Sequence, residues 1–318
     1  MKAKLANEKK TQSFKTIYAN TLDELLSKDK NIVVLDADLS TSSGVAPLFK
    51  KYPDNCVNFG IAEGNMAGAA TGMSKLGLKP YIHSFSPFVS RKTIDQLYLS
   101  AAYSKEHVHI YGSDAGIWSQ KSGATHSTFD DIAIMRAIPT VNVFAPCDGV
   151  AFKWILEEYA RNPGIFYNRG PRKNEVENIY ADDATFEIGK GYVLKEGKDI
   201  AIIAIGMMVQ ESLKAAEELK KDGIDVTVVD LFSIKPYDKE LLQELICNNK
   251  IIVAAENASC IGGIGEIIGK EIALSTNNPK FIHIAVNDTF SEVGTLDYLK
   301  NKFGLDYQNI VEKIKEAL

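Results

Sequence analysis

Short runs of β-branched and aliphatic residues alternate with longer amphipathic stretches along the first half of the chain. Four of these runs are predicted to be strands, at residues 32–35, 108–111, 141–144 and 164–167. Helical patterns occupy the stretches between them. Strands that alternate with helices in this way indicate parallel sheets covered by helices, so the fold class is predicted to be α/β.

The same alternation starts again in the second half. Strands are predicted at 199–205, 224–230 and 250–255, and a helix at 210–221 is closed by Gly223. Glycine just past the last helical turn is a common C-terminal signal. The polar, acidic segment at 172–186 separates the two halves, so we predict two domains, 1–180 and 185–318.

Composition narrows the classes of function. The 318 residues are 45% hydrophobic and 24% charged, with a net charge of −5 and no clustering of Lys or Arg. These values argue against a nucleic-acid partner, and no apolar run approaches the ~18 residues that span a bilayer. The four cysteines (Cys56, Cys147, Cys247 and Cys260) lie far apart and lack CxxC spacing. They are expected to be buried thiols of a cytoplasmic protein.

Polar residues directly follow several of the predicted strands, where ligands of open α/β sheets bind. Four segments have this character, at 36–40, 58–66, 83–88 and 113–126. The sequence therefore predicts a site built from loops at one edge of a sheet.

Three kinds of side chain in these segments could carry chemistry, and each has a plainer interpretation. Glu63 begins a predicted helix of small residues, where it is either a poorly solvated carboxylate or a first-turn residue stabilised by the helix dipole. His126 is either an acid–base group or a structural loop residue. Phe85 and Phe88 are either core residues or a wall for a ligand. No second His or Cys has metal-ligand spacing, so no metal ligand is predicted.

Taken together, the motifs resemble the pyrimidine-binding and C-terminal domains of the transketolase family. The most specific is Phe59-Gly-Ile-Ala-Glu-Gly-Asn-Met66, which resembles the signature G-I-A-E-x-N-M. Leu35-Asp-Ala-Asp-Leu-Ser40, Gly123-Ala-Thr-His126 and Asp230-Leu-Phe-Ser-Ile-Lys-Pro236 follow in the family's order. The similarity covers almost the whole chain.

The resemblance implies thiamine diphosphate as the cofactor and Glu63 as a catalytic residue. Glu63 would hydrogen-bond the aminopyrimidine N1′ and favour the imino form that removes the thiazolium C2 proton. The resulting carbanion would transfer a two-carbon ketol unit from a ketose to an aldose. This role requires a carboxylate that is held away from water.

The resemblance also implies roles for neighbouring residues. Four are expected to bind the cofactor together with Glu63: Asp38, Phe85, Phe88 and Arg91. His126 is expected to contact the substrate near its reacting carbons and is the second catalytic candidate. The segment that holds these residues is the pyrimidine-binding half of the family's site.

The family binds the cofactor diphosphate through Mg²⁺ held by a Gly-Asp-Gly motif, which does not occur in these 318 residues. The resemblance therefore implies an obligate partner, an N-terminal transketolase subunit that carries the diphosphate-binding domain and the Mg²⁺ ligands. An α2β2 assembly is expected, with sugars or sugar phosphates as substrates.

The substrate positions depart from the family pattern. Family members that act on sugar phosphates carry an Arg where this chain has Gln12, a His where it has Asp114, and an Asp where it has Ser122. Arg169 and Ser42 match retained positions. A phosphate beside Asp114 would require a compensating cation such as Lys121 or Arg172. We therefore expect a modified sugar as substrate.

Two other functions are compatible with this domain pair. The first is a β subunit of a 2-oxo acid dehydrogenase, and the second is a non-catalytic assembly subunit that has lost substrate binding. The Gly123-Ala-Thr-His126 loop favours a transketolase over the first. Retention of Glu63, Phe85, Phe88 and His126 argues against the second.

Overall fold

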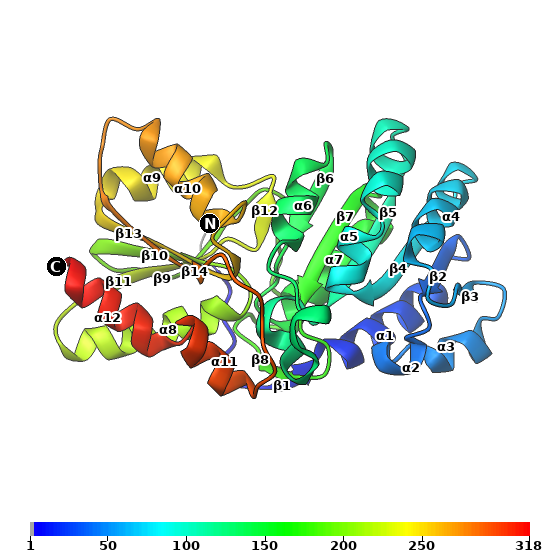
Figure 1. The fold of residues 1–318 in the computed structure, drawn as a ribbon, viewed down its shortest axis with the longest axis horizontal. Coiled ribbons are helices and arrows are strands. Elements are labelled where there is room, and N and C mark those ends of the chain that lie inside the picture. The colour runs from blue at the N-terminus through cyan, green and yellow to red at the C-terminus, as the bar shows by residue number, and fades with distance from the viewer. Residues whose placement is uncertain (1–2) are drawn as a thin grey trace.

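The computed structural model describes residues 3–318, which form two α/β units that lie side by side (Figure 1). The first half of the chain supplies six strands of a seven-stranded sheet, and the second half supplies the seventh and builds a five-stranded sheet. The two sheets are mainly parallel and are flanked by helices, as the alternating pattern predicted.

The seven-stranded sheet has the order β12-β6-β7-β5-β4-β2-β3, and only β12 is antiparallel to its neighbour. Its half of the chain contains β1 (Thr11–Ser13), α1 (Phe14–Leu26), β2 (Ile32–Asp36), α2 (Ser40–Ser43), α3 (Ala46–Lys51), β3 (Cys56–Asn58), α4 (Glu63–Lys75), β4 (Lys79–Phe85), α5 (Ser86–Arg91), the π-helix η1 (Gln96–Tyr103), β5 (Val108–Ser113), the 3₁₀ segment η2 (Gly116–Thr125), α6 (Asp131–Ala137), β6 (Val141–Phe144), α7 (Gly149–Arg161), β7 (Ile165–Gly170) and β8 (Glu175–Glu177).

The five-stranded sheet has the order β14-β13-β10-β11-β9, with β9 antiparallel. Its half of the chain contains β9 (Tyr192–Lys195), β10 (Asp199–Ala204), α8 (Met207–Lys221), β11 (Val226–Asp230), β12 (Ser233–Lys235), α9 (Lys239–Asn248), β13 (Asn249–Ser259), α10 (Ile264–Ala273), β14 (Lys280–Val286), α11 (Leu296–Phe303) and α12 (Tyr307–Ala317).

Side chains of the central strands alternate between two apolar cores. In β4, Tyr81 joins the core that holds α1 and α7, whereas Ile82 joins the core that holds α4, α5 and α6. Tyr111 and Ile110 divide in the same way in β5. β5, which is buried on both faces, carries the apolar run that made it recognisable in the sequence, whereas β4 was not among the predicted strands.

The predicted strands are present, and the predicted helix of the second half begins earlier than expected. That helix, α8, starts at Met207 rather than Gln210. Its end is confirmed, because Gly223 has φ +78° and its N–H donates to Lys220 O over 3.0 Å. Apolar residues mark a helix body well, whereas its first turn depends on contacts outside the helix.

The polar segment between the halves is ordered by backbone pairing. β8 pairs antiparallel with β1, and Asp148 Oδ2 accepts the N–H groups of Ile179 and Tyr180 over 2.8 and 2.9 Å. β12 of the second half joins the sheet of the first half. The division into domains 1–180 and 185–318 stays a prediction about folding units.

The cysteines differ from the expectation of four buried thiols. Cys56 and Cys147 are buried, but Cys260 is half-buried and Cys247 is exposed. Cys247 lies in the last turn of the amphipathic helix α9, where it faces solvent. Apolar neighbours in sequence did not reveal which face of that helix is covered.

Asp230, at the end of β11, is a buried carboxyl at the junction of the two halves. Its Oδ2 accepts hydrogen bonds from Tyr180 Oη over 2.8 Å and from Cys147 Sγ over 3.2 Å. Burial is the main cause that raises the pKa of Asp230 to about 7. The folded protein therefore holds a proton there that the unfolded chain has lost above about pH 4.

The free energy of unfolding should fall as the pH rises from about 4 to 7, because the folded state binds the extra proton over that range. Between about pH 5 and pH 8, Asp230 should lower the wild-type free energy of unfolding by about 3 kcal/mol. This fall should be absent in Asp230→Asn. Urea titrations at the two pH values measure this. Asp225→Asn, at an exposed carboxylate paired with Lys195, is the matched control and should keep the wild-type slope. An unchanged slope in Asp230→Asn would contradict the assignment.

Candidate functional site

The carboxyl ends of β2, β4, β5 and β7 lie at one edge of the seven-stranded sheet, because these neighbouring strands are parallel. All four polar segments predicted from the sequence meet at or beside this edge. Segments that lie up to 90 residues apart in the chain therefore contribute to one site.

Glu63 is the first residue of α4 and is 3% exposed. Ser84 Oγ donates to its Oε1 over 3.2 Å, and Lys92 Nζ donates to its Oε2 over 3.0 Å. The two partners come from the end of β4 and from the residue after α5. The structure thus gives Glu63 the poorly solvated position that a proton-sharing carboxylate needs.

Phe85, Phe88 and His126 form an aromatic cluster next to this carboxylate. The His126 ring centroid lies 5.8 Å from that of Phe85 and 5.2 Å from that of Phe88, with edge-on geometry in both pairs. Lys92 Nζ lies 4.5 Å from the centroid of Phe88, so it joins the cluster to Glu63. The predicted aromatic wall and His126 are therefore brought together with the carboxylate.

A cavity of about 460 Å³ opens beside the cluster. Its lining consists mainly of polar and cationic side chains from η2 and from the segment after β7. The lining residues are Phe85, Asp114, Trp118, Ser119, Gln120, Lys121, Ser122, His126, Arg172, Lys173 and Asn174. The cavity has the size and polarity of a small-molecule site.

Asp114 and Arg172 neutralise one another in the cavity wall. Arg172 Nε and Nη2 lie 2.9 and 2.8 Å from Asp114 Oδ2, and the two side chains are only 12% and 11% exposed. Burial raises the pKa of Asp114, and the charge and hydrogen bonds of Arg172 oppose that rise. The carboxylate that replaces the expected His is thus compensated within the chain.

Beneath the cavity, Asp36, His83 and Ser113 form a hydrogen-bonded chain across three strands. His83 Nδ1 donates to Asp36 Oδ2 over 3.0 Å, and His83 Nε2 lies 3.0 Å from Ser113 Oγ. The order of residue types is that of a serine hydrolase triad, but all three side chains are completely buried. Their arrangement ties the ends of β2, β4 and β5 together and offers no surface to a substrate.

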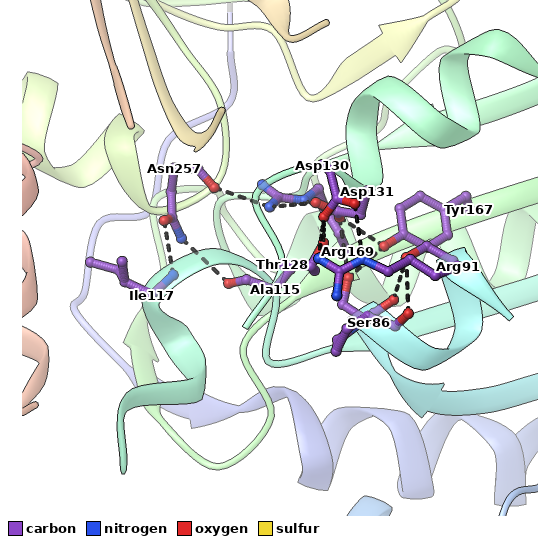
Figure 2. Close-up of polar contacts among 12 residues, drawn as sticks. Ser86, Arg91, Ala115, Ile117, Thr128, Asp130, Asp131, Tyr167, Arg169 and Asn257 are labelled. Carbon is purple, nitrogen blue, oxygen red and sulfur yellow. Dashed lines mark hydrogen bonds and ion pairs between the residues drawn. The ribbon is translucent and has the colours of Figure 1, made fainter. Parts of the chain in front are cut away.

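Two predicted site residues are engaged outside the cavity (Figure 2). Arg91 forms a bidentate pair with Asp130, over 2.9 and 2.6 Å. Arg169 is buried and binds Asp131 over 2.7 and 3.2 Å and the carbonyl of Asn257 over 3.0 Å. Their contacts with cofactor and substrate stay predictions.

The three remaining candidates lie at the rim or away from the cavity. Asp38 exchanges hydrogen bonds with Asn58 at the end of β2. Ser42 O accepts from Arg172 Nη1 over 3.3 Å, so it is joined to Asp114 through that arginine. Gln12 is an exposed residue of β1 and does not line the cavity.

Lys92, Trp118 and Lys173 also lie at this candidate site, and no motif in the sequence distinguished them. Lys92 follows Arg91 directly, and only its contact with Glu63 distinguishes the two cations. Trp118 and Lys173 face the cavity from segments that begin after β5 and β7. The position of each segment after a parallel strand was the available signal.

Residues 3–318 contain neither a cluster of metal-binding side chains nor a helix suited to span a membrane. No cluster of three or more His, Cys, Asp or Glu side chains in this range is arranged to hold a metal ion. No helix in the same range has the length and apolar character required to span a membrane.

The structure is that of a two-domain α/β protein, with a buried carboxylate beside an aromatic cluster at the carboxyl edge of a parallel sheet. The family model described as "Transketolase, pyrimidine binding domain" matches residues 10–175, and "Transketolase, C-terminal domain" matches residues 189–310. The chain belongs to the transketolase family.

Two curated relatives and one solved structure illustrate the similarity. A 6-deoxy-6-sulfo-D-fructose transketolase subunit of Clostridium sp. is 39% identical, over 94% of this chain and 92% of the relative. One subunit of an apulose-4-phosphate transketolase of Actinobacillus succinogenes is 32% identical, over 79% and 82%. A split gene transketolase, solved as an inactive β4 tetramer, is 36% identical with a TM-score of 0.86, over 96% and 98%.

The pairing of Asp114 with Arg172 can be tested without any assay of activity. Arg172→Met should lower the free energy of unfolding at neutral pH by about 3–5 kcal/mol, because it leaves a buried carboxylate without a cation. Asp114→Asn combined with Arg172→Met should recover most of that loss. Urea denaturation of wild type, the two single variants and the double variant gives the coupling. A double variant as unstable as Arg172→Met would contradict the assigned pairing.

Proposed function

We propose that this chain is the pyrimidine-binding subunit of a heteromeric transketolase, which transfers a two-carbon ketol unit from a ketose to an aldose. The observation that carries the proposal is the Glu63 carboxylate, which is 3% exposed beside Phe85, Phe88 and His126. The named activities of the two transketolase subunits to which the chain is similar support it. This similarity also favours a transketolase over a 2-oxo acid dehydrogenase or an assembly subunit.

The residues present fit an aminopyrimidine of thiamine diphosphate. Glu63 offers a carboxylate to a ring nitrogen, and Phe85 and Phe88 offer apolar surface to the ring. When bound, the cofactor would supply a nucleophilic carbon for the ketose carbonyl. Glu63 would share a proton with the pyrimidine, and Lys92 would leave Oε2 so that this contact can form. His126 would hold or move a proton on a substrate oxygen.

A partner subunit is part of the proposal, with Mg²⁺ and the diphosphate held there in an α2β2 assembly. The surface around Glu63 supports a protein partner, because Ile61 is 78% exposed and Ile94, two residues after Lys92, is 40% exposed. Large exposed apolar side chains that cluster on one face are typical of interaction sites. The relatives named as transketolase subunits also support it.

The proposed substrate is a sugar with an anionic or otherwise modified end. Arg172 is occupied by Asp114, whereas the cavity cations Lys121 and Lys173 form no ion pair with an acid among residues 3–318. Both lysines are exposed and come from the two segments that frame the cavity mouth. The sulfosugar and apulose phosphate in the names of the relatives are examples of such modified sugars.

Replacing the carboxylate of Glu63 tests the proposed activity. Glu63→Gln should lower ketol transfer by at least about 100-fold while circular dichroism and the urea midpoint stay close to wild type. Exchange of the thiazolium C2 proton for deuterium, followed by NMR with the partner present, should slow in parallel. Ser84→Ala removes a neighbouring hydroxyl and is the matched control, with a smaller effect expected. Wild-type exchange in Glu63→Gln would refute the role.

Neutralising the cavity cations tests the proposed substrate class. Lys121→Ala and Lys173→Ala should each raise KM for the anionic sugar by about 10-fold, through loss of a charge-assisted hydrogen bond. Lys50→Ala, at an exposed residue of α3, is the control and should leave KM unchanged. Xylulose 5-phosphate turnover as efficient as that of common transketolases would exclude a modified sugar as the preferred substrate.

A further inference from the structure

The substrate loop, defined as residues 116–128, carries Ser122 and His126 into the cavity. Its interior conformation is irregular, because Gln120 has φ 43° and Gly123 has φ 63°. Within the loop, Ser127 is hydrogen-bonded to Gly123 and Ser119, and Gly294 N donates to Gln120 O over 3.4 Å. Contacts at the two ends of the loop fix its base relative to the rest of the chain.

The entry of the substrate loop is held by Asn257 of β13, which belongs to the other sheet. Asn257 Oδ1 accepts from Ile117 N over 3.0 Å, and Asn257 Nδ2 donates to Ala115 O over 3.4 Å (Figure 2). The side-chain amide thus binds the backbone on both sides of Gly116. Asn257 is 3% exposed, so water does not replace these bonds.

Gly116 is required by this contact. It has φ +64°, and a Cβ at this position would lie 2.3 Å from Asn257 Oδ1. The glycine lets the amide reach the backbone, and its own N–H donates to Thr128 O over 2.9 Å. The entry and exit of the loop are therefore joined at the point where Asn257 binds.

The end of β13 also holds the exit of the loop. Ser259 N donates to Phe129 O over 2.8 Å. The carbonyl of Asn257 accepts from Arg169, which in turn binds Asp131 (Figure 2). The end of β13, in the five-stranded sheet, is thus hydrogen-bonded to both ends of the substrate loop of the other half.

We propose that Asn257 is a positioning residue, which fixes the base of the substrate loop and so places Ser122 and His126 for the substrate. The C-terminal half then contributes to substrate binding as well as to assembly. The effect on substrate rests on the proposed transketolase function, whereas the effect on the loop does not.

Trp118 is an intrinsic fluorescence probe of the substrate loop, because it follows Ile117 directly and lines the cavity. In a Trp154→Phe background it is the sole tryptophan. Asn257→Ala should raise acrylamide quenching of Trp118 by about 2-fold, since the base of the loop loses its partners. This measurement needs no partner subunit and no substrate.

Asn55→Ala is the matched control. Asn55 Nδ2 donates to Lys30 O over 2.9 Å and to Ile32 O over 2.8 Å, so it is also a side-chain amide that binds backbone at two points. Asn55 precedes the edge strand β3 and lines neither of the cavities that Trp118 lines. Asn55→Ala should lower stability in a similar way but leave Trp118 quenching at the wild-type value. Equal quenching in the two variants would overturn the proposal.

The assembled enzyme gives the second readout. Asn257→Ala should raise KM for the sugar about 10-fold with a smaller change in kcat, and Asn55→Ala should change neither. If wild type transfers no ketol unit, the proposed function fails, and the quenching result alone decides the positioning role.

A conservative variant covers the case in which Asn257→Ala fails to fold. Asn257→Asp keeps the acceptor for Ile117 N and loses the donor to Ala115 O. Its quenching should lie above wild type but rise by less than about 2-fold. Wild-type quenching in a folded Asn257 variant would refute the proposal.

Discussion

The buried ion pair between Arg169 and Asp131 connects the parts of the molecule on which the site depends. Both side chains are at most 5% exposed, so their removal from water is costly. Tyr167 Oη and Ser86 Oγ also donate to Asp131, and the carbonyl of Asn257 takes a further guanidinium N–H. These added hydrogen bonds offset the cost and tie β7, α5 and α6 to β13 of the other sheet.

The cations around the site fall into two groups, according to whether they have a carboxylate partner. Arg169, Arg91 and Arg172 each have a carboxylate partner within 3 Å, so they organise the walls. Lys121 and Lys173 lie at the cavity mouth without such a partner in the described residues. A free ammonium on a flexible stem can follow a substrate group, whereas a paired guanidinium holds its own carboxylate in place.

Glu63, Phe85, Phe88 and His126, which the sequence motifs selected together, also lie together in the structure. Glu63 begins a helix directly after a strand and turn, so its location followed from the element pattern. Arg91 and Arg169 were assigned by position alone, and their carboxylate partners lie 39 and 38 residues away in the chain. No local pattern indicates which of several nearby acids a long cationic side chain will reach.

Periodicity by itself determined the α/β class, half of the strands in the described residues, and the edge of the sheet where polar segments collect. These features depend on the burial of apolar residues at fixed spacings, which a linear chain records directly. Only the tertiary structure decided that Lys92 reaches Glu63, that Arg172 compensates Asp114, and that Asn257 holds the substrate loop. These contacts join residues that lie 29, 58 and 140 residues apart in the chain, so they depend on how the elements pack, which the sequence does not record directly.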